Sequence, residues 1–306
     1  MLMKDPPIKV ADGVRMLGTN EYPALLVTDA GEGAIFEGGV GAVGPVVKEQ
    51  LADLDVSVDL VKLVIITHAH PDHVMAVPAF RELFPAVTVC ASKAAAGTLS
   101  VEKAINFFTK IDGMLTEALI KAGSIKEKHR PQPLKEKQIP VDRVLADGDT
   151  VAIGQRKFDV LATPGHSDCS LSFHEQATGL LIISDATGYY IPDSGYFWPN
   201  YFADYGAYIE SIQRLMSLNA EIVCLSHNAV VKGAEAVKAY FEAAATATEA
   251  YHERIVTEIG AGRSQEEVAR QLGNEVYENT QLLGVEFFQK NCEQLVKQSV
   301  RYSQND

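Results

Sequence analysis

One stretch of six residues constrains this chain more than any other feature. His68, His70, Asp72 and His73 follow directly on an apolar run that has the composition of a buried strand. Residues two apart lie on the same side of an extended chain but nearly opposite each other on a helix. His68 and His70 can therefore share one metal ion only if the backbone is extended there, and Pro71 favours this by biasing His70 away from helical geometry. The pattern predicts a strand that ends in a metal-binding turn.

Asp72 and His73 extend this turn. Proline is accepted in the first turn of a helix, so these two residues are predicted where the chain turns into a helix that begins near Val74. Three imidazoles and one carboxylate form a mixed nitrogen and oxygen set that suits zinc, iron or manganese. A surface loop that is merely rich in histidine is disfavoured, because five of the eight histidines fall in this segment and at two later strand ends.

Three further candidates stand at the ends of later predicted strands. His166 follows Gly165, which lets the backbone turn sharply and aim the imidazole. Asp185 ends an apolar run, and its two carboxylate oxygens can bridge two cations. His227 ends another predicted strand. Each residue taken singly has the alternative of an ordinary loop, turn or cap. Together they predict one site, because function concentrates where strands end.

Two β-rich halves flank a helical segment, and further helices follow the second half. Short apolar runs bounded by Gly, Asp and Pro predict strands near residues 24–27, 33–36, 61–67, 86–90, 151–153, 157–162, 170–173 and 180–184. Apolar residues three or four apart predict amphipathic helices between the halves and after Gly233. Ser264 with Glu267 forms a capping box that begins one of them. We expect one domain over residues 1–232, with a helical insertion at about 97–139, and a helical C-terminal region over 233–306 that packs near the site.

Composition disfavours several classes of function. The formal net charge of −13, from 40 acidic and 27 basic residues, argues against a nucleic-acid partner, because nothing offsets repulsion from phosphates. The first residues lack the apolar core of a secretory signal, and no apolar run approaches the roughly 20 residues that span a bilayer. We therefore expect a cytoplasmic protein with no membrane partner. The four cysteines are widely scattered, which predicts free thiols.

The segment 68–73 resembles the His-x-His-x-Asp-His hallmark of the metallo-β-lactamase superfamily. The best counterparts of the family's later ligands are His166 in TPGHS, Asp185 in IISDA and His227 in CLSHN. The resemblance covers about residues 14–231 and implies an α/β fold, a four-layer αββα sandwich with the metals at one edge of its two sheets.

By this resemblance the chain holds two divalent ions, with zinc preferred and iron or manganese as alternatives. Metal one is assigned to His68, His70 and His166, metal two to Asp72, His73 and His227, and Asp185 to the bridging position. Two residues depart from the family pattern. Ser226 stands where the family often has Gly, and Glu37 replaces the Asp of an early Asp-x-Gly element, which makes Glu37 a candidate hydrogen-bond partner of a ligand.

The implied reaction is hydrolysis. Divalent ions lower the pKa of bound water, so hydroxide is available near pH 7 to attack a carbonyl or phosphoryl centre, and Asp72 can then pass a proton to the leaving group. A thioester or related carbonyl ester is the preferred small-molecule substrate. The alternatives are a lactonase or phosphodiesterase that uses the same site, an iron-dependent persulfide oxygenase, and a signalling module that keeps the metals but acts by binding a partner.

The surroundings of the site give weaker indications. The insertion and the C-terminal helices are similar to those of glyoxalase II-like thioesterases, especially the quinolone-signal-biosynthesis type, in which helices roof the site. The aromatic-rich segment 189–202 is predicted either to line a pocket or to pack on the core. The basic run 121–137 is interpreted as a solvated face rather than a phosphate contact, and Cys169 as a packing residue. A homodimer contact is an alternative role for the C-terminal helices.

Overall fold

Two seven-stranded sheets form the centre of the computed structural model, which describes residues 1–304. The first sheet runs in the order β2-β3-β4-β5-β6-β7-β8, antiparallel from β2 to β5 and parallel from β5 to β8. Its strands are β2 (Ile8–Ala11), β3 (Val14–Gly18), β4 (Pro23–Asp29), β5 (Glu32–Phe36), β6 (Val61–Ile65), β7 (Thr88–Ser92) and β8 (Arg143–Leu145).

The second sheet runs in the order β1-β16-β15-β12-β11-β10-β9, and β12 and β15 are its parallel neighbours. Its strands are β1 (Leu2–Met3), β9 (Thr150–Ile153), β10 (Arg156–Ala162), β11 (Leu171–Glu175), β12 (Leu180–Ile182), β15 (Ile222–Cys224) and β16 (Val230–Lys232). A separate hairpin of β13 (Tyr189–Ile191) and β14 (Tyr196–Trp198) follows β12.

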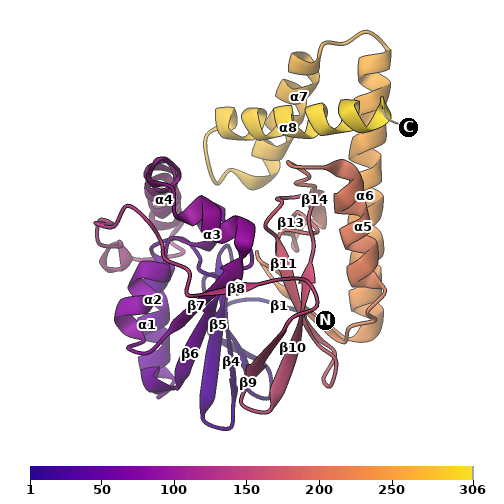
Figure 1. The fold of residues 1–306 in the computed structure, drawn as a ribbon. Coiled ribbons are helices and arrows are strands. Elements are labelled where there is room, and N and C mark those ends of the chain that lie inside the picture. Colours follow the sequence, from indigo (N-terminus) through magenta and orange to yellow (C-terminus); the bar gives the residue numbers. More distant parts are fainter. Residues whose placement is uncertain (305–306) are drawn as a thin grey trace.

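Helices cover the outer faces of both sheets (Figure 1). The first sheet carries α1 (Val43–Asp53), α2 (Val77–Leu83) and α3 (Lys93–Leu99), and α4 (Glu102–Ala122) lies beside α3 at the upper end of this sheet. The second sheet carries α5 (Tyr205–Met216) and α6 (Ala234–Gly260), and α7 (Gln265–Thr280) and α8 (Val285–Ser303) lie beyond the strand ends. Three short 3-10 turns complete the order: η1 (Val58–Leu60), η2 (Pro71–His73) and η3 (Glu127–His129). The expected αββα architecture is confirmed.

Both faces of each sheet are buried, one against the other sheet and one beneath the helices. In β4, Leu25 and Val27 belong to the core between the sheets, whereas Ala24 and Leu26 belong to the core beneath the helices. Successive side chains of a strand point to opposite faces, so a strand covered on both sides must be apolar at every position. This is why the predicted strands appear in the sequence as short continuous apolar runs.

Two of the expected helices differ in extent from the prediction. The helix after the histidine segment begins at Val77, not near Val74. The reason is that the amides of Met75 and Ala76 donate to the carbonyls of Gly39 and Gly38, which ties this stretch to the loop after β5 instead of to a helical turn. Within residues 97–139 the long helix is α4 alone, and apart from η3 the chain beyond it is irregular. The capping box of Ser264 and Glu267 at the start of α7 is confirmed.

Strand direction brings the candidate site residues to one edge. In the second sheet β10, β12 and β15 run the same way, since β10 and β12 are both antiparallel to β11 and β15 is parallel to β12. In the first sheet β5 and β6 are parallel. The segments that follow these strands therefore meet at shared edges, and α7 and α8 lie over that end of the molecule (Figure 1). In the described residues, no helix combines the length and apolar character needed to cross a membrane.

Gly165 makes the closest approach in this framework. It has φ +115°, and an added Cβ would lie 2.3 Å from the Cα of Tyr208 on α5. We expect Gly165→Ala to lower the free energy of unfolding by about 3 kcal/mol or more, because both the backbone strain and the overlap with a helix backbone are unfavourable. Gly113→Ala is the matched control, since nothing lies within 4 Å of that position in α4; it should be neutral or slightly stabilising. Equal stability of the two variants in urea denaturation would contradict this account.

Candidate metal centre

Three histidines from two segments face one point. His70 Nδ1 lies 3.1 Å from His68 Nε2 and 2.8 Å from His166 Nε2, and the last two nitrogens are 3.2 Å apart. Burial lowers the pKa of all three imidazoles, that of His70 to about 3. Neutral imidazoles present lone pairs, which is the state that binds a cation.

A second group lies beside the first. Asp72 Oδ2 is 3.5 Å from His73 Nε2 and 3.8 Å from His227 Nε2. Burial alone would lower the pKa of both histidines, but the neighbouring carboxylates, Asp72 and Asp185 among them, raise it above the ordinary value. Without a cation, this group therefore attracts protons to its imidazoles. A metal ion would supply the same positive charge.

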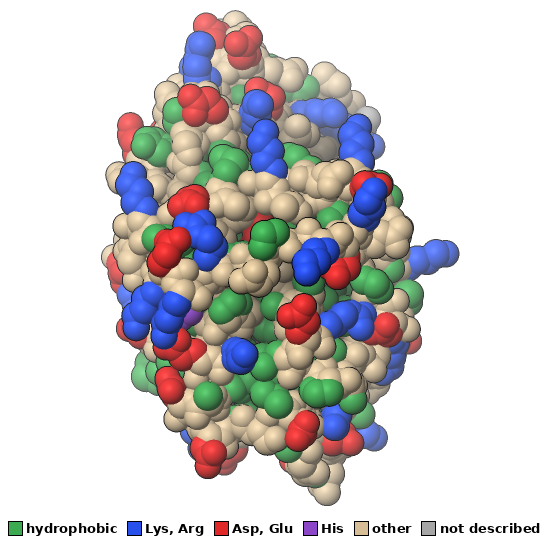
Figure 2. Space-filling model, turned by 90° about the vertical axis from the view of Figure 1, so that its left-hand side faces the viewer, with side chains coloured by type: hydrophobic (Ala, Val, Ile, Leu, Met, Phe, Trp, Pro, Cys, Tyr) green, Lys and Arg blue, Asp and Glu red, His purple; other side chains and the backbone are tan. Residues whose placement is uncertain are grey.

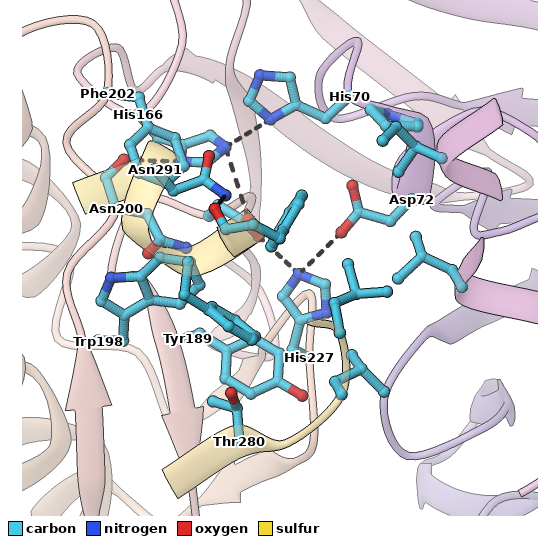
Figure 3. Close-up of a pocket in the computed structure, with 18 of the residues that line it drawn as sticks. His70, Asp72, His166, Tyr189, Trp198, Asn200, Phe202, His227, Thr280 and Asn291 are labelled. Atoms are coloured by element: carbon cyan, nitrogen blue, oxygen red, sulfur yellow. Dashed lines mark hydrogen bonds and ion pairs between the residues drawn. The ribbon is translucent and has the colours of Figure 1, made fainter. Parts of the chain in front are cut away.

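Asp185 lies between the two groups. Its Oδ2 is 3.6 Å from His166 Nε2, whereas its Oδ1 is 3.3 Å from His227 Nε2 and 3.7 Å from His73 Nε2. Burial would raise the pKa of this carboxyl, but His227 and His73 hold it well below its usual range. The structure thus brings all seven candidate residues together at one end of a cavity, where several are visible in Figure 3.

Local backbone geometry explains the aim of the first segment. His70 is extended, with φ −103° and ψ 157°, as Pro71 predicted, and η2 follows at once. The amide of Gly38 donates to the carbonyl of His73 at 2.9 Å. A Cβ at Gly38 would lie 2.4 Å from that carbonyl oxygen, so only glycine allows the loop after β5 to support the turn.

Hydrogen bonds on the far ring nitrogens orient three of the imidazoles. The Nδ1–H groups of His166 and His227 donate to the carbonyls of Asn200 and Glu21, at 2.8 and 2.7 Å. His73 Nδ1 donates to Glu37 Oε2 at 3.0 Å. With the proton on Nδ1, each Nε2 is free to face the cluster. Sequence reasoning missed Asn200 and Glu21, because a backbone carbonyl leaves no residue-type signal.

The buried carboxylate of Glu37 contacts residues that follow strands of both sheets. Its Oε1 accepts from the Thr67 hydroxyl at 2.7 Å and lies 3.0 Å from Ser226 Oγ. Ser226 Oγ is also 2.9 Å from the carbonyl of Ile183. The two departures from the family pattern, Glu37 and Ser226, are therefore in contact, and the serine hydroxyl supports the carboxylate that holds His73.

The residues present fit a binuclear metal site. His73 Nε2 and Asp185 Oδ1 are buried and make no hydrogen bond of good geometry within the described part of the chain, since their nearest polar neighbours are other cluster members at 3.3 to 3.7 Å. Leaving such groups without a partner costs about 1–3 kcal/mol each or more, so their retention favours a ligand that the protein side chains do not supply. Imidazole and carboxylate donors suit several divalent ions, and the donor set does not select among zinc, iron and manganese.

The comparisons with known proteins agree with this geometry. The family model of the metallo-β-lactamase superfamily matches residues 20–227. The chain belongs to the metallo-β-lactamase superfamily. Members of this superfamily are generally hydrolytic enzymes that bind divalent metals. The matched range runs from Asn20 to His227, so it contains all seven candidate ligands.

Solved structures of this superfamily share the fold at low sequence identity. A metallo-β-lactamase family protein from Thermus thermophilus is 19% identical with a TM-score of 0.66, over 97% of this chain and 95% of its own. An archaeal superfamily protein from Sulfolobus tokodaii is 17% identical with a TM-score of 0.55, over 75% and 85%. The metallo-β-lactamase MIM-2 is 23% identical with a TM-score of 0.56, over 83% and 92%. These likenesses extend to the fold alone.

A cavity of about 330 Å³ lies over three histidines of the candidate metal cluster, His70, His166 and His227. Side chains of α4, the hairpin and its following loop, and the α7–α8 segment line it. The aromatic segment 189–202 divides between its two predicted roles. Tyr189, Trp198 and Phe202 line the cavity, whereas Phe197 packs on Tyr240 of α6.

Two other sequence features have structural roles. Cys169 is buried, and its Sγ accepts from the amide of Ala69 at 3.2 Å, so it braces the histidine segment. In the basic run, Lys128 pairs with Glu49 and Lys137 with Glu102. Figure 2 shows basic and acidic side chains interspersed over the face that includes α4. This arrangement agrees with a solvated, ion-paired face.

Glu37 provides a direct test of how the cluster is held. We expect Glu37→Gln to weaken metal binding about 10- to 100-fold, because the amide cannot accept from Thr67 and His73 at once as both carboxylate oxygens do. The measurement is competition with a chromophoric chelator. Glu82→Gln, an exposed change on α2, is the control and should bind as the unmodified chain does. A folded Glu37→Gln protein with unchanged affinity would show that this carboxylate does not position His73.

Proposed function

We propose that this chain is a two-metal hydrolase that acts on a thioester or related carbonyl ester. The observation that carries the proposal is the paired cluster at one end of a cavity with mostly apolar walls. His68, His70 and His166 are assigned to one ion, Asp72, His73 and His227 to the other, and Asp185 to both. When bound, such ions lower the pKa of water and polarise a carbonyl oxygen.

The protein's own groups have separate tasks in this scheme. The imidazoles of His68, His70 and His166, whose pKa burial lowers, supply neutral nitrogen donors. His73 and His227, whose pKa the carboxylates raise, would release a proton when a metal ion binds. Asp72 is the most accessible carboxylate of the cluster, with 26% of its side chain exposed, and it borders the cavity. Burial would raise its pKa, but His73 and His227 lower it below the usual range, so it is ionised and able to accept a proton and pass it to a leaving group.

A carbonyl ester is favoured over a phosphodiester because of the charges around the cavity. Among the lining residues in the described chain there is no lysine or arginine. Bound divalent ions would offset the charges of Asp72 and Asp185 at the cluster itself, but the rest of the lining has none of the cationic side chains that phosphate-binding sites commonly supply. An uncharged ester or thioester needs no such partner. The apolar walls in turn suit the organic part of an ester.

Metal content tests the proposal together with activity. We expect two metal ions per chain by elemental analysis, and hydrolysis of model thioesters that is lost after chelation and restored by metal. Asp185→Ala should reduce the content to one ion or fewer and lower turnover by orders of magnitude, because one carboxylate serves both ions. His174→Gln, on β11 outside the cluster, should leave both unchanged.

Three outcomes would overturn this assignment in different ways. Two ions in Asp185→Ala would exclude a bridging role. One iron per chain with oxygen consumption on a persulfide would favour the oxygenase reaction. Two ions with no hydrolysis of esters, thioesters or lactones would favour a binding module that retains its metals.

A further inference from the structure

The cavity wall opposite the histidines is built from apolar side chains of two separate segments. On α4, Phe107, Ile111 and Leu115 are four residues apart and so share one helix face. Across the cavity, Leu283 and Phe288 from the α7–α8 segment line the other side, together with Leu282 and Phe287. Neither segment contributes a candidate metal ligand. Because its side chains hold no metal ion, the shape of this wall can determine which substrates fit.

Aromatic rings connect the cluster to this wall without a break. The ring centroids of His166 and Phe202 are 5.3 Å apart, and those of Phe202 and Trp198 are 6.0 Å apart. Trp198 and Phe288 follow at 5.4 Å, as do Phe288 and Phe287. A substrate group that extends from the cluster towards α8 thus meets aromatic surface along its length.

The carboxylates that line the cavity all belong to the candidate metal cluster. These carboxylates are Asp72 and Asp185. The polar lining residues that the α7–α8 segment contributes are uncharged amides and a hydroxyl, namely Asn291, Gln294 and Thr280. Asn291 projects from α8 into the cavity (Figure 3), and its Nδ2 donates to the Phe287 carbonyl at 3.0 Å. Its Oδ1 is thus directed away from that bond and can accept from a neutral donor, but an anion would find no cationic partner.

We propose that the substrate carries an uncharged, apolar group, and that this group fills the space between α4 and the α7–α8 segment while the reactive carbonyl lies at the cluster. This inference rests on the proposed hydrolytic function and narrows it to apolar acyl esters or thioesters. The cavity of about 330 Å³ is at the small end of small-molecule pockets, which run from roughly 300 to 1,000 Å³. It therefore suits one acyl chain or one aromatic ring system rather than a large conjugate.

A chain-length series tests the apolar group. Acetyl, butyryl, hexanoyl and octanoyl thioesters of one neutral thiol are compared with a thioester of the octanoyl length that ends in a carboxylate. We expect kcat/KM to rise roughly fourfold for each buried methylene until the cavity is filled. The terminal carboxylate should reduce it by about 100-fold or more, since the buried charge is unpaired. Equal rates along the series, or a preference for the carboxylate, would overturn the inference.

Two pairs of variants assign the effect to the wall. Phe107 is 57% exposed, so Phe107→Ala should fold; we expect it to flatten the chain-length dependence. Met114→Ala, at an exposed position of the same helix outside the lining, should not. Gln294→Arg adds a cation to the lining and should restore at least tenfold of the activity on the carboxylate-terminated thioester. Glu293→Gln makes the same change in net charge on the neighbouring exposed residue and should restore nothing.

A binding measurement separates this inference from the hydrolytic function. Trp198 is the chain's single tryptophan and lines the cavity, so its fluorescence reports occupancy. Octanamide should quench it with saturation, and the chain-matched amide that ends in a carboxylate should not, except in Gln294→Arg. Selective binding without hydrolysis of any thioester would defeat the proposed function but keep the apolar site. Hydrolysis with no discrimination in either assay would defeat the apolar site alone.

Discussion

The site depends on one buried carboxylate that joins the two sheets. Glu37 follows β5 of the first sheet, accepts from Thr67 and His73 at the end of β6, and contacts Ser226 at the end of β15 in the second sheet. The candidate ligands are divided between the sheets, so their spacing is set by how the sheets pack. The hydrogen bonds of Glu37 fix the packing of the two sheets at the edge where the ligands lie. Buried polar networks specify one arrangement when all their hydrogen bonds are made.

Close packing and incomplete polar satisfaction coexist at this edge. The strands that lead to it are apolar on both faces, and Gly38 and Gly165 remove the side chains that would keep neighbouring backbones apart. Inside that rigid frame, several nitrogen and oxygen atoms face one another rather than internal partners. A rigid frame around unsatisfied groups is a preorganised ligand site, because the surrounding packing prevents the groups from turning away to find other partners.

The sequence was sufficient for the elements and the ligands but not for their surroundings. Histidines two apart before Pro71 predicted an extended metal-binding turn, and the apolar runs predicted most of the strands. The start of α2 was placed too early, because the hydrogen bonds of Met75 and Ala76 to Gly38 and Gly39 are non-local and leave no periodic signal. The contacts of the Asn200 and Glu21 carbonyls with the histidines, and the place of Asn291 in the cavity lining, could not be predicted either, because they also depend on non-local packing. Residue types indicate chemistry, whereas the packing of distant segments determines access to it.

The position of α7 and α8 along the chain has a consequence for synthesis of the protein. All seven candidate ligands precede residue 228, whereas the α7–α8 segment that lines the cavity begins at Gln265. During synthesis, which proceeds from the N-terminus, the ligand set leaves the ribosome before α7 and α8. A nascent chain can thus meet metal ions while its cluster is still open to the solvent. The order of the elements along the chain therefore allows the ligand set to be complete before α7 and α8 enclose the cavity.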